Sequence, residues 1–100
     1  MPSSTDRALN DQADQANLDA RVKRILWRAS HRGMKELDIM LGRYADAKAA
    51  AMDEASLQAF EEFLAMPDPD LHQWLMMEDE GAPPPGFSVL VADIRTFHGL

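Results

Sequence analysis

Apolar side chains recur in the first third of the chain at the spacing of one helix face. Counted from the first of them, they stand at offsets of 4, 7, 8 and 11 residues, the repeat of an amphipathic helix. They are Leu18, Val22, Ile25, Leu26 and Ala29. The stripe stops at Gly33, a residue type that ends helices in the left-handed conformation at low cost. The pattern predicts one helix that ends at or near this glycine.

A second helical stripe follows Gly33 and continues into a tail of small residues through Ala51. Its apolar positions are Leu37, Met40, Leu41, Tyr44 and Ala45. Gly42 inside this run lowers helix stability by about 1 kcal/mol relative to alanine, so we expect close helix packing there rather than a break. The two segments are therefore predicted to form a helical hairpin.

Helix-start signals mark a third and a fourth helix. Asp53 precedes a run of apolar residues at helical spacing and is expected to cap the third helix. That helix ends before Pro67, because the residue that precedes a proline is driven out of the helical region. Asp68 is predicted to cap a short fourth helix with Pro69 at its first position. The inward positions of these two helices are Leu57, Phe60, Phe63, Leu64, Leu71, Trp74 and Leu75.

A proline-rich linker over residues 81–86 separates these helices from the end of the chain. Its three successive prolines remove backbone donors and favour polyproline geometry. Apolar residues then return at helical spacing and predict a fifth helix, although residues 89–91 alone also fit a strand. The returning residues are Phe87, Leu90, Val91, Ile94 and Phe97. The whole pattern is typical of an all-α protein, a compact five-helix bundle in a single domain.

The beginning of the chain differs from the rest in composition. Residues 1–16 are mostly polar or small, and such a segment buries too little apolar surface to offset the entropy of ordering. We therefore predict a disordered N-terminal arm over residues 1–16, followed by the helical bundle over residues 17–100. The arm resembles neither an Arg-rich transit peptide nor a secretory signal, so a bacterial cytoplasmic protein is expected.

Composition and charge narrow the classes of function. The 100 residues include no cysteine, which excludes disulfides and thiol nucleophiles. The chain also lacks a run of about 18 apolar residues, so no membrane span is predicted. A net charge of −7 argues against general nucleic-acid binding. The charge is unevenly distributed along the chain, however. Residues 21–43 carry seven basic and two acidic side chains, whereas residues 44–100 carry two basic and eleven acidic ones. The predicted hairpin is thus a positive segment in an acidic chain.

Candidate catalytic chemistry is sparse. The three histidines, His31, His72 and His98, stand in different predicted elements, without the i,i+4 pairing of a metal site. Surface or packed imidazoles explain them better than metal ligation. Neighbouring acids such as Glu61 and Glu62 point apart on a helix and do not form an acid–base pair. No catalytic, cofactor-binding or metal-binding residue is predicted, and the chain is expected not to be an enzyme.

The strongest functional signal is a basic stripe on the first helix. It consists of Arg21, Arg24, Arg28 and Arg32, at offsets of 0, 3, 7 and 11. A solvated helix face is one interpretation. The other is a protein interface, because Trp27 lies beside these arginines and off the apolar stripe, and Trp and Arg dominate binding energy at interfaces. At the turn, Arg32 and Glu36 could brace each other or both face a partner, and their spacing fits either arrangement.

The residues around this turn resemble the SdhE family of FAD assembly factors of succinate dehydrogenase, whose signature is RGxxE. The resemblance rests on Arg32-Gly33-Met34-Lys35-Glu36-Leu37-Asp38, preceded by Trp27-Arg28 and followed by Asp68-Pro69-Asp70-Leu71 and Trp74-Leu75. It covers about residues 20–98. It implies a small five-helix bundle, in agreement with the periodicity.

The resemblance also implies a function. Family members bind the flavoprotein subunit of succinate dehydrogenase, and in bacteria often that of fumarate reductase, and promote covalent attachment of FAD to it. This chain would bind no cofactor stably and would act on the FAD of its client, without membrane or nucleic-acid partners. The expected partner-binding residues are Arg32, Gly33 and Glu36 of the motif, the flanking Met34, Lys35 and Asp38, and Arg24, Trp27 and Arg28 of the preceding helix. An antitoxin-like or nucleic-acid-binding regulatory module that uses the basic first helix is the alternative.

Overall fold

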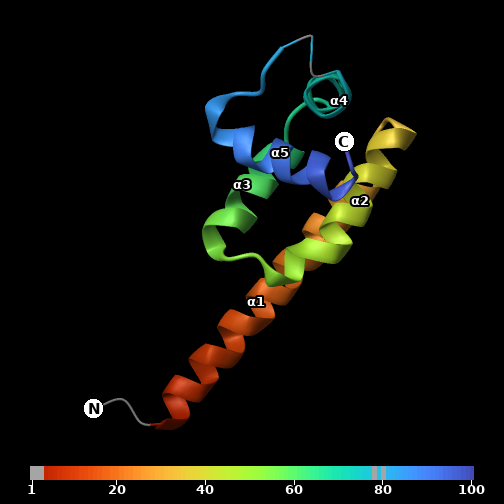
Figure 1. The fold of residues 1–100 in the computed structure, drawn as a ribbon. Coiled ribbons are helices and arrows are strands. Elements are labelled where there is room, and N and C mark those ends of the chain that lie inside the picture. Colours follow the sequence, from red (N-terminus) through yellow and green to blue (C-terminus); the bar gives the residue numbers. More distant parts are fainter. Residues whose placement is uncertain (1–3, 78, 80) are drawn as a thin grey trace.

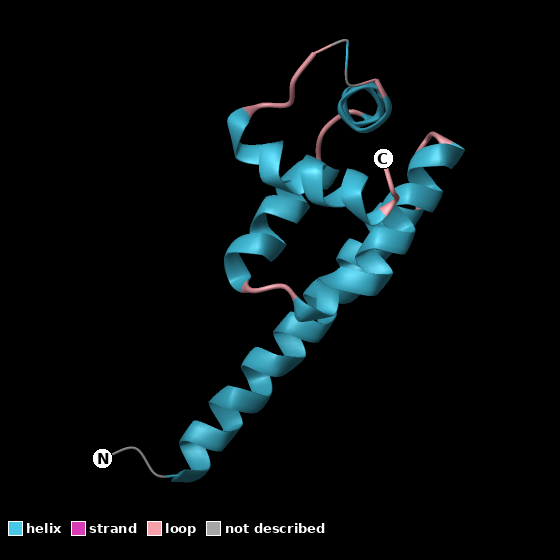
Figure 2. Ribbon diagram, viewed as in Figure 1, coloured by secondary structure: helices cyan, strands magenta, loops and turns pink. Residues whose placement is uncertain are grey.

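Helices make up almost the whole of the computed structural model of the chain (Figures 1 and 2). The structure describes residues 4–77, 79 and 81–100, and for residues 4–15 only the backbone. Within these residues there are five α-helices and no β-strand, so the predicted all-α class is confirmed. The elements are α1 (Ser4–Ser30), α2 (Lys35–Lys48), η1 (Ala49–Ala51), α3 (Glu54–Leu64), α4 (Asp68–Met76), η3 (Pro85–Phe87) and α5 (Ser88–Phe97).

The first two helices form the predicted hairpin. α2 runs back along the C-terminal half of α1, and the turn between them spans residues 31–34 (Figure 1). Gly42 of α2 lies against α1, where a β-carbon at this position would come within 3.3 Å of the Ser30 β-carbon. The interior glycine therefore marks a close helix contact, as expected.

The remaining helices cover the open side of the hairpin and enclose a single apolar core. Every apolar position predicted for the second and third helices is buried, and Ile25 and Ala29 carry the stripe of α1 into the core. Phe60 and Phe63 of α3 are its largest fully buried side chains. The complete buried set is Ile25, Ala29, Leu37, Met40, Leu41, Tyr44, Ala45, Ala49, Leu57, Phe60, Phe63, Leu64, Leu71, Leu75, Val91 and Ile94.

The helix boundaries agree with most of the local signals. The Asp53 carboxylate accepts a hydrogen bond from the backbone N–H of Ser56 at 2.8 Å, which confirms the predicted cap and lowers the pKa of Asp53. Asp68 does not cap α4: the N-cap position is Pro67, and no side chain caps this helix. Residues 88–97 form a helix rather than a strand, because Val91 and Ile94 pack one helical face against the core.

The two segments predicted to be irregular differ from each other. Residues 81–84 lack regular structure, and residues 85–87 form one 3-10 turn that leads into α5. Residues 4–16, by contrast, continue α1 as a helix that extends away from the other helices (Figure 1). The packed part of α1 supplies the nucleus, so further residues can extend the helix without the cost of a new nucleation step. Composition alone does not reveal this effect. Residues 1–3, 78 and 80 lie outside the described residues, and the domain boundary after residue 16 stays a prediction.

Among the described residues, none of the helices is both long enough and apolar enough to cross a membrane.

Substitutions at two apolar residues of α2, Leu37 and Ile39, test which face of this helix packs against the core. Leu37 is fully buried, whereas Ile39 is 44% exposed. We expect Leu37→Ala to lower the free energy of unfolding by about 2–5 kcal/mol, because it removes buried methyl groups and leaves a cavity. Ile39→Ala, the matched control, is expected to cost less than about 1 kcal/mol in chemical denaturation. Equal losses for the two variants would contradict the orientation of α2.

Candidate functional site

Arg32 of the hairpin turn points into the protein and joins it to the connection between α3 and α4. Its Nε donates to Asp68 Oδ1 at 2.9 Å, and its Nη2 lies 2.7 Å from the same oxygen. Nη1 donates to the carbonyl oxygen of Leu64 at 2.6 Å, and Nη2 to that of Met66 at 3.1 Å. The side chain is only 12% exposed. The guanidinium thus satisfies carbonyl groups at the end of α3 and a carboxylate at the start of α4.

Gly33 completes this joint through its backbone. Its N–H donates to Asp68 Oδ2 at 2.6 Å, and a β-carbon on residue 33 would lie 2.9 Å from that oxygen. In the same turn, the backbone N–H of Arg32 donates to the Asp38 carboxylate. Gly33 is not among the glycines with positive φ. The sequence-based reason for this glycine was therefore wrong: it allows close approach of a carboxylate, and it does not supply a left-handed conformation.

Glu36 has a different partner from the one that the sequence suggested. Its Oε2 lies 3.2 Å from Nε2 of His72 on α4, and its side chain is 65% exposed. Arg32 is engaged with Asp68 instead. Of the two arrangements considered for Arg32 and Glu36, neither is present as such: the arginine faces inward and the glutamate outward.

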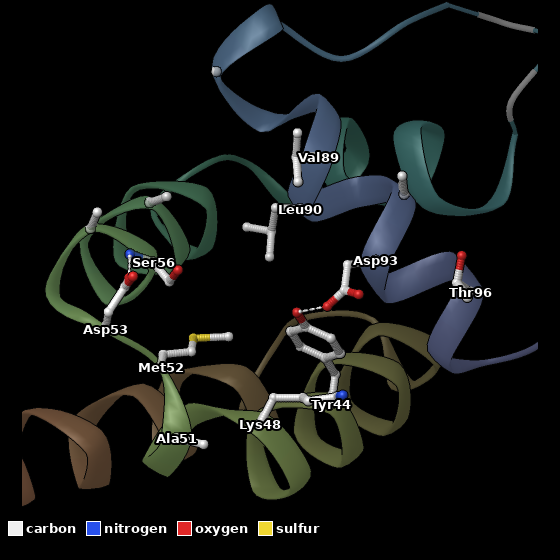
Figure 3. Close-up of a pocket in the computed structure, with 14 residues that line it drawn as sticks. Tyr44, Lys48, Ala51, Met52, Asp53, Ser56, Val89, Leu90, Asp93 and Thr96 are labelled. Carbon is white, nitrogen blue, oxygen red and sulfur yellow. Dashed lines mark hydrogen bonds between the residues drawn. The ribbon is translucent and has the colours of Figure 1, made fainter.

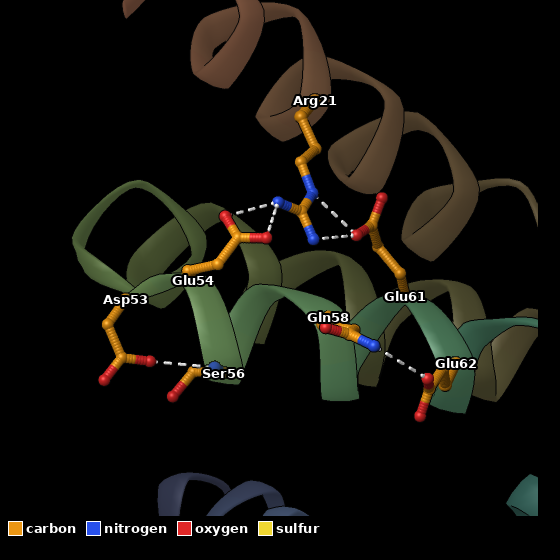
Figure 4. A network of polar contacts seen from close by, with 7 residues as sticks. All are labelled: Arg21, Asp53, Glu54, Ser56, Gln58, Glu61 and Glu62. Carbon is orange, nitrogen blue, oxygen red and sulfur yellow. Dashed lines mark hydrogen bonds and ion pairs between the residues drawn. The ribbon is translucent and has the colours of Figure 1, made fainter. Parts of the chain in front are cut away.

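The basic stripe of α1 divides into structural and exposed members. Arg21 lies between two acids of α3, with Nε at 2.6 Å from Glu61 Oε1 and Nη1 at 2.7 and 2.6 Å from the Glu54 oxygens (Figure 4). The hydrogen bonds to Glu61 and then to Glu54 raise the pKa of Arg21 above its usual value. Arg24 and Arg28 are exposed and form no ion pair with any residue that the structure describes. Only the middle of the stripe remains accessible to a partner.

Trp27 lies on the same exposed part of α1 and is 62% exposed. Its ring stacks on the ring of His31, with centroids 4.3 Å apart and planes 10° from parallel. His31 Nδ1 in turn lies 2.8 Å from the carbonyl oxygen of Trp27. A large aromatic surface is therefore held in one orientation in solvent, beside two arginines. This combination is typical of a protein interface.

The structure separates the nine predicted partner-binding residues into two groups. Arg24, Trp27, Arg28, Gly33, Lys35 and Glu36 are exposed. Arg32 and Asp38 form hydrogen bonds within the protein, and Met34 packs against the core. Two further residues, Asp68 and His72, were missed as parts of this region. Asp68 had been interpreted only as a helix cap, and nothing in local spacing links position 72 to position 36.

A groove on another face of the molecule lies between α3 and α5, with α2 as its floor (Figure 3). Its volume is about 700 Å³, and Met52 and Leu90 contribute to its apolar lining. The Tyr44 hydroxyl donates to Asp93 Oδ2 at the floor. Burial, and then this hydrogen bond, raise the pKa of Tyr44.

Among the described residues, no group of three or more histidine and carboxylate side chains is arranged to hold a metal ion. His98 lies with Nε2 at 2.8 Å from the Met40 carbonyl oxygen, as a packed imidazole would.

Comparison with known proteins gives consistent results. Residues 23–98 match the family described as flavinator of succinate dehydrogenase. The chain is 43% identical to the FAD assembly factor SdhE of Acetobacter pasteurianus over 74 residues, and 39% identical to that of Legionella pneumophila over 64 residues. It is 31% identical to the mitochondrial succinate dehydrogenase assembly factor 2 of Arabidopsis thaliana over 70 residues. The nucleic-acid-binding alternative gains no support from these relatives.

The matches cover different shares of the proteins compared. They take in 74%, 63% and 70% of this chain for the Acetobacter, Legionella and Arabidopsis proteins, in that order. They span 66% of the Acetobacter factor and 80% of the Legionella factor, but 37% of the Arabidopsis protein. The chain thus spans less than two thirds of the length of the Acetobacter and Arabidopsis relatives.

Arg32 of the hairpin turn and Arg28 of α1 distinguish the joint from the exposed surface. Arg32→Ala leaves Asp68 Oδ1 and two carbonyl groups without their donor, and we expect it to lower the free energy of unfolding by about 2–3 kcal/mol. Arg28→Ala, the matched control, removes an exposed arginine and is expected to change it by no more than about 0.5 kcal/mol. Chemical denaturation of the two variants measures the difference. An unchanged stability of Arg32→Ala would show that the joint does not stabilise the fold.

Tyr44 is the single tyrosine of the chain, so its ionisation can be followed by phenolate absorbance. Because the folded pKa is raised, ionisation is expected only above the ordinary range near about 10. The buried phenol then stabilises the fold below that pH, and this contribution is lost as the pH rises further. In Asp93→Asn the pKa of Tyr44 should fall part of the way, because burial is unchanged. Titration at the ordinary pKa in the folded wild-type protein would contradict the buried position.

Proposed function

Because the chain belongs to the family of flavinators of succinate dehydrogenase, we propose that it binds the flavoprotein subunit of that enzyme and promotes covalent attachment of FAD to it. The relatives named FAD assembly factor SdhE support this activity. The flavoprotein of fumarate reductase is a second candidate client of the same kind. The bacterial origin of several relatives supports a bacterial cytoplasmic location.

The observation that carries the proposal within the structure is the exposed surface at and before the hairpin turn. Lys35 and Glu36 begin α2, and the stacked Trp27 lies between Arg24 and Arg28 in the chain just before the turn. All five side chains are exposed. We propose that this docking surface contacts the client. A complementary client surface would offer a socket for the Trp27 ring, acids for the two arginines and a donor for Glu36.

The proposed factor acts without catalytic groups of its own. Its role is to bind one conformation of the flavoprotein, in which the acceptor side chain and the flavin are aligned, and so to raise the population of that conformation. Alignment of two reacting groups can by itself account for a large part of a barrier. The FAD belongs to the client, and the chain itself is proposed to hold no cofactor stably.

The uneven charge supports docking in one orientation. Residues 21–43 carry a net positive charge and residues 44–100 a net negative one, and Arg24 and Arg28 of the positive segment are exposed without an ion pair among the described residues. Such a distribution steers a charged partner toward one face and increases the rate of association at low salt. The two exposed arginines of α1 are placed to take part in this steering.

The exposed carboxylate of Glu36 provides the most direct test. Glu36→Gln keeps the shape of the side chain and removes its charge, and we expect it to reduce covalent flavin on the co-expressed flavoprotein subunit several-fold. Asp46→Asn is the matched control, because Asp46 is also an exposed acid of α2 and forms no ion pair within the described residues. Covalent flavin is measured by fluorescence of the denatured subunit, and circular dichroism confirms that both variants remain folded.

Two results would contradict the proposal. If the flavoprotein subunit acquires covalent flavin equally well with and without this chain, the chain is not its flavinator. If Glu36→Gln and Asp46→Asn both behave as the wild-type protein does, the client contact lies elsewhere on the surface.

A further inference from the structure

Glu36 is exposed, but its carboxylate is held by one contact with a distant part of the chain. His72 Nε2 donates to Glu36 Oε2 at 3.2 Å, across 36 positions of sequence. The Glu36 side chain is mostly in solvent, and the His72 side chain is three-quarters covered. The imidazole is therefore the more fixed of the two groups. The contact restrains a flexible side chain at Oε2, and 65% of that side chain stays exposed to solvent.

The position of His72 follows from the joint at Arg32. Asp68 and His72 are four residues apart on α4, so they lie on the same face of that helix. Arg32 and Gly33 hold Asp68 against the hairpin turn, and this places the face that carries His72 beside the start of α2. The order of contacts is thus Arg32 to Asp68, and then His72 to Glu36.

We propose that His72 is a positioning residue for Glu36, and that α4 in this way takes part in recognition of the client. The inference rests on the proposed function. His72 holds Glu36 Oε2, while Oε1 accepts a hydrogen bond from the client. The group that fits a fixed, exposed carboxylate oxygen is a cationic donor, and an arginine guanidinium matches it best.

Preorganisation gives this contact its effect on affinity. A free glutamate side chain loses several rotamers when a partner immobilises it, at a cost in binding free energy. The hydrogen bond from His72 restricts those rotamers before the partner arrives. Loss of the restraint is expected to weaken binding by about threefold to tenfold, without removal of any group that touches the client.

Arg32 acts in the same sequence of contacts, one step further from the client. Its side chain is engaged with Asp68 and with two carbonyl groups, so we infer that it positions α4 and does not itself bind the client. Loss of activity on substitution of Arg32 would then arise from displacement of His72 and Glu36.

The test compares two replacements of His72 in the full chain. His72→Ala removes the donor, whereas His72→Gln retains an N–H at a similar distance from the backbone. Affinity for the purified flavoprotein subunit is measured by calorimetry for both, in the wild-type and in the Glu36→Ala background, which leaves His72 no acceptor at residue 36. We expect His72→Ala to weaken binding by about threefold to tenfold and His72→Gln to restore most of the affinity. In the Glu36→Ala background, His72→Ala should have little further effect.

Each other outcome has a distinct meaning. If His72→Ala binds as the wild-type protein does, or weakens binding equally in both backgrounds, His72 does not act through Glu36 and the inference is overturned. A failure of His72→Gln to restore affinity, with circular dichroism and thermal unfolding unchanged, overturns it as well. If His72 fails either of these tests and Glu36→Ala still weakens binding, the inference is overturned and the proposed function stands without it. If the wild-type chain does not bind the flavoprotein subunit, the proposed function fails, and the inference fails with it.

Discussion

The arrangement of the helices at the hairpin turn depends on one guanidinium group. Arg32 lies in the turn between α1 and α2 and reaches the last residue of α3 and the first residue of α4, so a single side chain connects the hairpin turn to two further helices. Its partners are oxygen atoms that would otherwise lie poorly hydrated at helix ends, where backbone groups lack intrahelical partners. The core sets the general packing of the bundle, but this polar joint fixes where α4 lies relative to α2.

Local signals in the sequence were sufficient for most of the fold. The apolar periodicity located the buried faces of the first four helices, because burial repeats at 3.6 residues wherever a helix packs on one side. For α5 it located Val91 and Ile94, whereas Phe97 is exposed and Phe87 lies in the turn before the helix. Asp53 and Gly42 were interpreted correctly, since a cap and a close helix contact each depend on a residue type at a single position. Each of these features involves neighbours in the chain or one face of one helix.

The direction of the polar side chains at the turn was beyond this kind of reasoning. Arg32 contacts Asp68 and Glu36 contacts His72, in each case across 36 positions of sequence. No spacing rule connects such residues, because they meet only after the helices have packed. The role of Gly33 was misjudged for the same reason, because the group that requires the space is a carboxylate of another helix. The family resemblance selected the candidate residues, but it did not indicate which way they point.

The close fit of Gly33 against Asp68 has a consequence for how such a sequence can change. Arg32, Gly33 and Asp68 form a set in which a new side chain at one position requires an adjustment at another, so these positions are expected to vary together or not at all. Glu36 contacts His72 and, in the proposed function, a surface of the client, so it is expected to vary with both. The residues of one short motif are therefore subject to different constraints, those of the fold at Arg32 and Gly33 and, in the proposed function, those of the client at Glu36.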